Sequence, residues 1–234
     1  VRLLNRTTRR VSLTGPGQDF LGRSQRILAE YDEATSTLSS LHTEPTGRLK
    51  LSAPMSFGLA HLAPLLPIFM RAHPKLVLEL VLNDRFVDLV EEGFDLCVRI
   101  GTLADSSLVA RRLATVRLVL CASPDYLRRR GMPVEPADLA RHRGLIYGLG
   151  TNGGRWQLQG PGGPTPAEIP SVLCANNGDV LAEAAVAGEG ITLAPTFIVG
   201  DALRAGTLVE VLAPYAPKPF GLYAIWPANR LLPA

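Results

Sequence analysis

Two apolar runs separated by a short polar stretch form the clearest hydrophobic pattern in the chain. Residues 76–82 are apolar except for Glu79, and residues 95–100 form a second run that ends at Gly101. Runs of this length predict strands buried on nearly both faces. The segment between them starts at Asn83 and carries apolar residues at helical spacing, so the pattern predicts a βαβ unit in a parallel sheet. Ligands are expected beyond the carboxyl ends of such strands.

A long seam of apolar positions precedes this unit. Positions spaced alternately four and three apart run from residue 20 to residue 41, among them Phe20, Ile27, Tyr31 and Leu38. This spacing is typical of an a/d seam. A helix that packs on its own domain would show a similar stripe. The length of the seam and the Pro- and Gly-bearing segments at both ends favour a dimer-forming helix, followed by a hinge at residues 43–47.

The first fourteen residues predict a small β-hairpin with an arginine-rich tip. Two short apolar runs flank residues 5–10, which include Arg6, Arg9 and Arg10. The whole chain has a formal net charge of +3, whereas its first fourteen residues hold four arginines and no acid. The remainder is therefore close to neutral, and a polyanion partner is expected for the basic head alone. A hairpin this small is unstable alone, so a preceding part of its domain is expected.

The rest of the chain predicts two α/β lobes with a cleft between them. The pattern assigns the first lobe to about residues 47–116 and the second to about residues 117–221. The final strand, from Phe220 to Trp226, is expected to return to the first lobe, to which residues 222–234 are assigned. A cleft between two such lobes is a natural site for a small molecule.

Catalytic, metal and membrane signals are weak or missing. Residues 148–153 match the G-x-G-x-x-G fingerprint, but no helix is expected after them, so a dinucleotide site is rejected. The four histidines are not spaced for a metal, and three scattered cysteines do not make a disulfide framework. No apolar stretch reaches the roughly 20 residues of a membrane span. We therefore expect a cytoplasmic protein that is not an enzyme and uses no cofactor.

Polar helix starts recur after the predicted strands. Such starts are found at Ser56, Asn83-Asp84, Ser123, Asn176-Asn177 and Thr196. For any one of them, capping of free backbone N–H groups is the simpler interpretation. Several starts facing one cleft would also favour a small anion such as a carboxylate, because N–H groups and helix dipoles converge there.

Several stretches together resemble the LysR-type transcriptional regulators. They cover most of the chain in the family's order: RLLNRTTRRVSLT, LSAPMSFG, DRFVDLVEEGFDLCVRIG, SSLVARRL, CASPDYL and ANNGDVLAEAAVAGEGITLAP. The resemblance implies a two-lobed α/β effector domain like type 2 periplasmic binding proteins, preceded by a β-hairpin wing and a long linker helix. Residues 1–14 would be the wing of a winged helix-turn-helix domain, and residues 15–46 the linker helix and hinge.

The resemblance also implies site residues and partners. The wing would bring Arg6, Arg9 and Arg10 near DNA, and the linker helix would form a homodimer or take part in a tetramer. Nine residues match positions that border the effector cleft: Ser56, Asn83, Arg85, Gly101, Thr102, Tyr147, Asn176, Pro195 and Thr196.

The chain departs from the family pattern at both ends. The recognition helix of the DNA-binding domain and the last helix of the first lobe are missing, which indicates truncation of a longer protein. The remaining alternatives are a solute-binding protein of a transport system, which the basic hairpin and the dimer-type helix disfavour, and an α/β enzyme, which the lack of a catalytic set disfavours.

Overall fold

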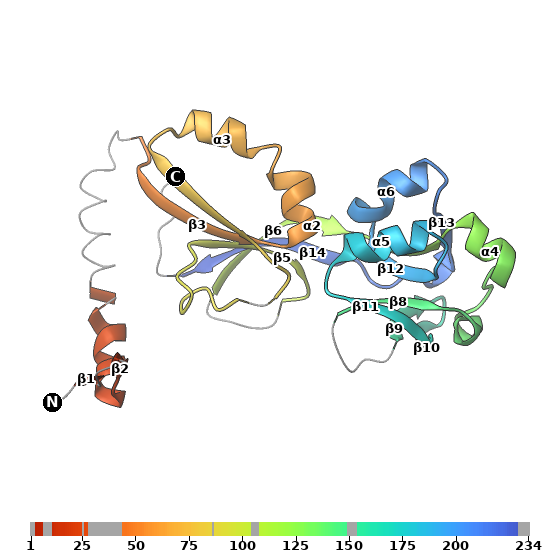
Figure 1. Cartoon of the computed structure of the whole chain (residues 1–234), viewed down its shortest axis with the longest axis horizontal. Coiled ribbons are helices and arrows are strands. Elements are labelled where there is room, and N and C mark those ends of the chain that lie inside the picture. The colour runs from red at the N-terminus through yellow and green to blue at the C-terminus, as the bar shows by residue number, and fades with distance from the viewer. Residues whose placement is uncertain are drawn as a thin grey trace. The chain divides into compact units, whose positions relative to one another are not determined.

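The computed structural model describes residues 3–6, 11–24, 26–27, 44–85, 87–103, 108–148 and 154–228. The chain divides into two units, which are described separately: Val1–Thr46 with Leu231–Ala234, and Gly47–Arg230 (Figure 1). The second unit holds both lobes of the predicted effector domain.

The first unit begins with the predicted hairpin. Strands β1 (Leu4–Arg6) and β2 (Val11–Leu13) pair antiparallel. A helix then covers residues 15–24, and residues 26–27 are also helical. The Gly17 N–H donates to Thr14 Oγ1 at 3.0 Å, which caps the helix start. The hairpin and the start of the linker helix are thus confirmed, while Arg9, Arg10, Tyr31 and Leu38 lie outside the described residues.

Lobe 1 is built on a five-stranded mixed sheet with the order β4-β3-β5-β14-β6 (Figure 1). Strand β3 pairs parallel with β4 and β5, and β14 pairs antiparallel with β5 and β6. The last strand therefore returns to lobe 1 as predicted, and it begins at Phe220, where the sequence placed its start. The strands are β3 (Gly47–Ala53), β4 (Leu76–Leu82), β5 (Leu96–Gly101), β6 (Leu108–Val116) and β14 (Phe220–Pro227).

The sequence predicted a helix between β4 and β5, and this prediction is wrong. The described residues of this segment form bends and turns. The Asp88 carboxylate accepts hydrogen bonds from the N–H groups of Val90 and Glu91, both at 2.9 Å, and so holds a local turn in place of a continued helix. Leu89 and Phe94 are 6% and 2% exposed, so the apolar positions anchor this turn on the sheet. Strands β4 and β5 remain parallel to β3, as predicted.

The helical segment after β3 bends, as its prolines predict. It contains α2 (Met55–Phe57), the π-turn η1 (Gly58–Leu62) and α3 (Leu66–Ala72). The two parts meet at an angle of 63° across residues 63–65, which include Pro64. Ser56 was expected to cap this helix, but the cap position is Pro54 and Ser56 lies inside the first turn. Within the described residues, no single helix is long and apolar enough to cross a membrane, and only this bent pair would suffice by length and composition.

Lobe 2 is built on a second five-stranded sheet with the order β11-β8-β12-β7-β13. Strand β6 ends in lobe 1 at Val116 and β7 begins in lobe 2 at Leu118, where the sequence placed the boundary. The elements of lobe 2 are β7 (Leu118–Ala122), α4 (Pro124–Arg130), η2 (Pro136–Arg141), β8 (Gly144–Tyr147), β9 (Arg155–Gly160), β10 (Gly163–Glu168), β11 (Ser171–Ala175), α5 (Gly178–Val186), β12 (Ile191–Pro195), α6 (Thr196–Arg204), β13 (Val209–Val211) and η3 (Ala213–Tyr215).

Two hydrophobic clusters bury the two faces of the lobe 2 sheet. One joins α4, η2 and the β9–β10 hairpin, and its largest buried side chain is Tyr126, 1% exposed. The other packs α5 and α6 on the opposite face, around Leu181 and Val199. Alternate residues of β7 belong to opposite clusters, so both faces of this strand are buried. Its sequence is therefore a continuous apolar run. These two layers fix the helix starts that face lobe 1.

Candidate functional site

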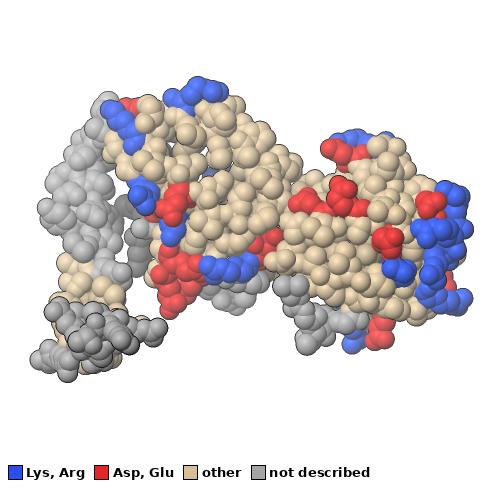
Figure 2. All heavy atoms as spheres, in the orientation of Figure 1, with Lys and Arg blue, Asp and Glu red and all other residues tan. Residues whose placement is uncertain are grey.

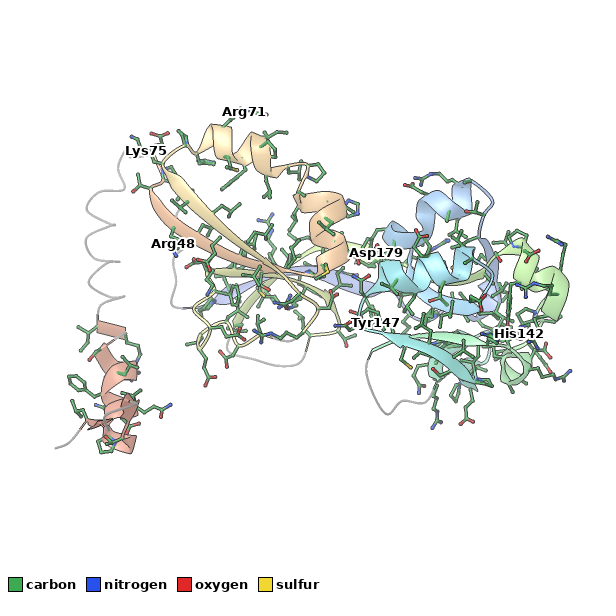
Figure 3. All side chains as sticks on the ribbon, viewed as in Figure 1. Arg48, Arg71, Lys75, His142, Tyr147 and Asp179 are labelled. Atoms are coloured by element: carbon green, nitrogen blue, oxygen red, sulfur yellow. The ribbon has the colours of Figure 1, made fainter. Side chains whose placement is uncertain are left out.

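A cavity of about 400 Å³ lies between the two lobes of the second unit. Its volume falls in the usual range for small-molecule sites, about 300–1,000 Å³. Figure 3 shows Tyr147 and Asp179 on the side of lobe 2 that faces lobe 1. The lining residues are Pro54, Ser56, Asp84, Arg85, Arg99, Ile100, Leu118, Ile146, Tyr147, Arg155, Trp156, Gly178, Leu181, Thr192, Leu193, Ala194, Pro195, Phe197, Ile198 and Phe220.

The hydroxyl of Ser56 is engaged across the cleft. It donates a hydrogen bond of 2.6 Å to Oδ2 of Asp179, at the start of α5 in the other lobe. Ser56 is 8% exposed, whereas Asp179 is an exposed residue, so the bond is partly buried. Hydrogen bonds to an ionised acceptor are short and strong, and this contact therefore ties α2 to α5.

Asp84 forms a second contact between the lobes. Its carboxylate accepts from the Met55 N–H at 3.1 Å within lobe 1. In lobe 2, partial burial together with the charge and hydrogen bond of Asp84 raises the pKa of Tyr147 to about 12. Tyr147 is therefore protonated at neutral pH and its hydroxyl is a donor.

Three arginines line the cavity, and their partners differ. Arg85 is paired with Glu92 through two hydrogen bonds, one of them 2.8 Å, and this contact holds the pKa of Glu92 below its usual range. Arg99 donates to Val98 O at 3.1 Å and to Ser52 Oγ at 3.2 Å. Neither Arg99 nor Arg155 has a carboxylate partner among the residues that the structure describes. Two guanidinium groups without an ion-pair partner among the described residues therefore line the cavity, together with the Asp84 carboxylate.

The basic end of lobe 2 provides a contrast. Basic side chains gather around α4 (Figure 2). There, Arg128 and Arg129 both pair with Asp125, at 2.7 and 3.1 Å, and Arg143 pairs with Glu189 at 3.2 Å. That surface is exposed and largely compensated, so its charge is weak evidence for a ligand.

Aromatic and apolar side chains form much of the cavity wall. Trp156 is 7% exposed and belongs to the core of lobe 2. Phe197 of α6 reaches lobe 1, where its ring lies edge-on to Phe57 with centroids 5.9 Å apart. It also lies 5.7 Å from the ring of His61. The wall can therefore hold the apolar body of a small organic molecule.

Some of the sequence-predicted site residues line this cavity and others lie beside it. Ser56, Arg85, Tyr147 and Pro195 are lining residues. The other predicted residues do not line it: Asn83, Gly101, Thr102, Asn176 and Thr196.

For two of these residues, Asn176 and Asn83, the next residue in the sequence takes the expected place. Asn177, and not Asn176, caps α5, because its Oδ1 accepts from the N–H groups of Asp179 and Val180 at 3.0 and 3.2 Å. At the end of β4, Asp84 lines the cavity in place of Asn83, whose N–H is bonded to Ala53 O at 3.0 Å.

Sequence reasoning missed Arg99, Arg155, Trp156 and Phe197 as lining residues. A weak signal existed for Arg99, which is a lone charge inside an apolar strand. No comparable signal marks Arg155, because the segment before it has no regular pattern. Its position in the cavity follows from the folding of lobe 2 against lobe 1.

Comparisons with known proteins agree with this architecture. The family model described as the LysR substrate binding domain matches residues 42–234. An HTH-type transcriptional regulator of Haemophilus influenzae is 40% identical over 232 residues, which cover 99% of this chain and 81% of that protein.

Solved structures give the same result. CrgA, a LysR-type transcriptional regulator of Neisseria meningitidis, is 33% identical with a TM-score of 0.71, and the match covers 98% of this chain and 78% of that one. The virulence activator AphB of Vibrio cholerae is 30% identical with a TM-score of 0.70, covering 97% and 77%. These matches give no support to a transport solute-binding protein. The chain belongs to the LysR family of HTH-type transcriptional regulators, and Gly47–Arg230 contains its effector-binding domain.

Proposed function

We propose that the effector of this regulator is a small organic acid bound in the cavity between the lobes. The observation that carries the proposal is the pair Arg99 and Arg155, two cavity-lining guanidinium groups without a described carboxylate partner. A guanidinium group presents several N–H donors in a plane that matches a carboxylate, and it stays charged at any physiological pH.

The surrounding wall supports an acid with an apolar body. Trp156, Ile198 and Phe197 give the cavity apolar and aromatic surface, and its volume suits a molecule of modest size. We propose that the side chains and backbone groups around this space position the acid. The proposed set contains Arg99 and Arg155 together with the nine residues named from sequence. These nine are Ser56, Asn83, Arg85, Gly101, Thr102, Tyr147, Asn176, Pro195 and Thr196.

The chemistry of the site favours recognition over conversion. Within the described part of the chain, no histidine and no cysteine lines the cavity. The raised pKa of Tyr147 keeps its hydroxyl protonated. A catalytic base would need a pKa near the working pH. The proposal is therefore a binding site and not an active site.

The N-terminal unit would carry the dimer contact and part of the DNA contact. Phe20 and Ile27 are 58% and 65% exposed within this chain, so the described half of the seam is uncovered. We propose that this seam, with Tyr31 and Leu38, pairs two subunits, and that Arg6, Arg9 and Arg10 lie near DNA phosphates in the cytoplasm. Effector binding would shift the arrangement of the paired subunits, in a dimer or a tetramer, on DNA.

A thermal-shift screen tests the proposed effector class. The purified chain is heated with a library of small carboxylic acids and, as matched controls, with the corresponding primary amides. We expect some acids to raise the thermal midpoint and their amides to raise it far less, because only the acids can pair with both arginines. Equal stabilisation by acids and amides would contradict the proposal.

A further inference from the structure

A hydrogen bond between a hydroxyl and a carboxylate joins the lobes across the cleft. Ser56 of lobe 1 donates to Asp179 of lobe 2 at 2.6 Å. The two residues lie 123 positions apart in the sequence, so the contact exists only when the lobes are together. The bond is charge-assisted, with a buried donor and an exposed acceptor.

A second pair of groups lies across the same cavity. Tyr147 of lobe 2 and Asp84 of lobe 1 both line it, and the Asp84 charge contributes to the raised pKa of Tyr147. The Asp84 carboxylate accepts from the Met55 N–H at 3.1 Å. Both pairs therefore involve consecutive residues, Met55 and Ser56, at the start of α2.

Aromatic packing alone would not fix how the lobes meet. Phe57 and His61 of lobe 1 touch Phe197 of lobe 2 with ring centroids 5.9 and 5.7 Å apart. Such apolar contacts hold the lobes together but tolerate sliding, because the hydrophobic effect has no direction. Hydrogen bonds are directional, so the bond between Ser56 and Asp179 sets how the lobes meet.

We propose that Asp179 is a positioning residue of the effector cleft: it holds the Ser56 hydroxyl of the opposite lobe, and this bond keeps the lobes closed. The regulatory meaning of this arrangement rests on the proposed binding of an acid. A carboxylate drawn in by Arg99 competes with Asp179 for the Ser56 hydroxyl. Its binding therefore shifts the balance between closed and open lobes.

Hydrogen exchange in the full chain tests the inference without any effector. The variants are Ser56→Ala, Asp179→Ala and the double variant, with Ser56→Thr as the conservative replacement that keeps a hydroxyl. Asp125→Ala is the matched control, because Asp125 also lies in the first turn of a lobe 2 helix but pairs only within that lobe.

Each single variant should speed exchange about fivefold or more on both sides of the contact, in residues 55–62 and in residues 178–181. The double variant should be no faster than the single ones, Ser56→Thr should restore slow exchange, and Asp125→Ala should leave residues 55–62 unchanged. Exchange that rises only in the lobe carrying the substitution, or effects that add in the double variant, would overturn the inference.

A parallel experiment with Tyr147→Phe tests the second pair in the same way. Exchange should rise at residues 55–62 although the substitution lies in lobe 2. No change there would show that Asp84 holds its loop without help from Tyr147. Because neither experiment uses an effector, the closure can fail while acid binding stands, and acid binding can fail while closure stands.

Discussion

The buried pair Tyr126–His142 allows a stability prediction that follows directly from geometry. Tyr126 and His142 are 1% and 5% exposed. The Tyr126 hydroxyl accepts from the Arg143 N–H at 2.9 Å and lies 3.1 Å from Nδ1 of His142. Since burial lowers the pKa of His142, the imidazole is neutral and Nδ1 accepts the hydroxyl proton. One oxygen thus satisfies a donor and an acceptor.

Replacing Tyr126 with phenylalanine keeps the ring and removes that oxygen. A buried polar group left without a partner costs about 1–3 kcal/mol. The substitution leaves two groups without a partner, the Arg143 N–H and Nδ1 of His142. Because water can reach the half-buried Arg143, the cost for its N–H lies at the low end of this range. We therefore expect the free energy of unfolding to fall by about 2–3 kcal/mol. Urea unfolding followed by circular dichroism measures this. Tyr215→Phe, which removes a hydroxyl with no bond among the described residues, is the control and should change stability by less than about 0.5 kcal/mol. An equally small loss for Tyr126→Phe would refute the reasoning.

Three further predictions concern other parts of the chain. The lowered pKa of His142 means that the unfolded state takes up a proton first, so stability should fall as the pH drops below about 6.5. His142→Asn, which keeps an acceptor, should make the urea midpoint less dependent on pH between pH 5 and about 6.5. An unchanged pH dependence would exclude His142 as its cause. Gly154→Ala should destabilise the chain far more than Gly131→Ala. Both glycines have positive φ, +78° and +89°, but only at Gly154 would a Cβ meet a backbone oxygen, at 1.9 Å. Equal unfolding midpoints for the two variants would contradict this. Ile27→Asp combined with Leu38→Asp should give monomers by light scattering, and an unchanged mass would remove the seam as the dimer contact.

The sequence predicted the strands of lobe 1 well because their apolar runs are long and clearly bounded. Leu76–Leu82 was predicted at its observed limits. The segment after it was predicted wrongly, because apolar spacing was read as a helix while the Asp88 side chain takes the local N–H groups. Periodicity shows which side chains are buried, but it does not show whether a polar side chain will compete with the backbone.

The site was predicted only in outline. The polar residue after β3 correctly placed Ser56 at the cavity, whereas Tyr147 was named only through the family resemblance. Two features depend on contacts between distant parts of the chain and were not predictable. One is the pairing of Ser56 with Asp179, and the other is the meeting of Arg99 and Arg155 at one cavity. Local patterns fix where a strand ends, whereas lobe closure decides which ends meet.

Calorimetric titration of the most stabilising acid tests the central claim most directly. The acid is titrated into the unmodified chain, into Arg99→Gln, into Arg155→Gln and into Arg128→Gln, a control that changes a compensated arginine outside the cavity. Loss of a charged hydrogen bond costs about 1.5–3 kcal/mol, so each cavity variant should bind about tenfold or more weakly. Arg128→Gln should bind like the unmodified chain. Unchanged affinity in both cavity variants would contradict the claim that this cleft recognises the acid through its unpaired arginines.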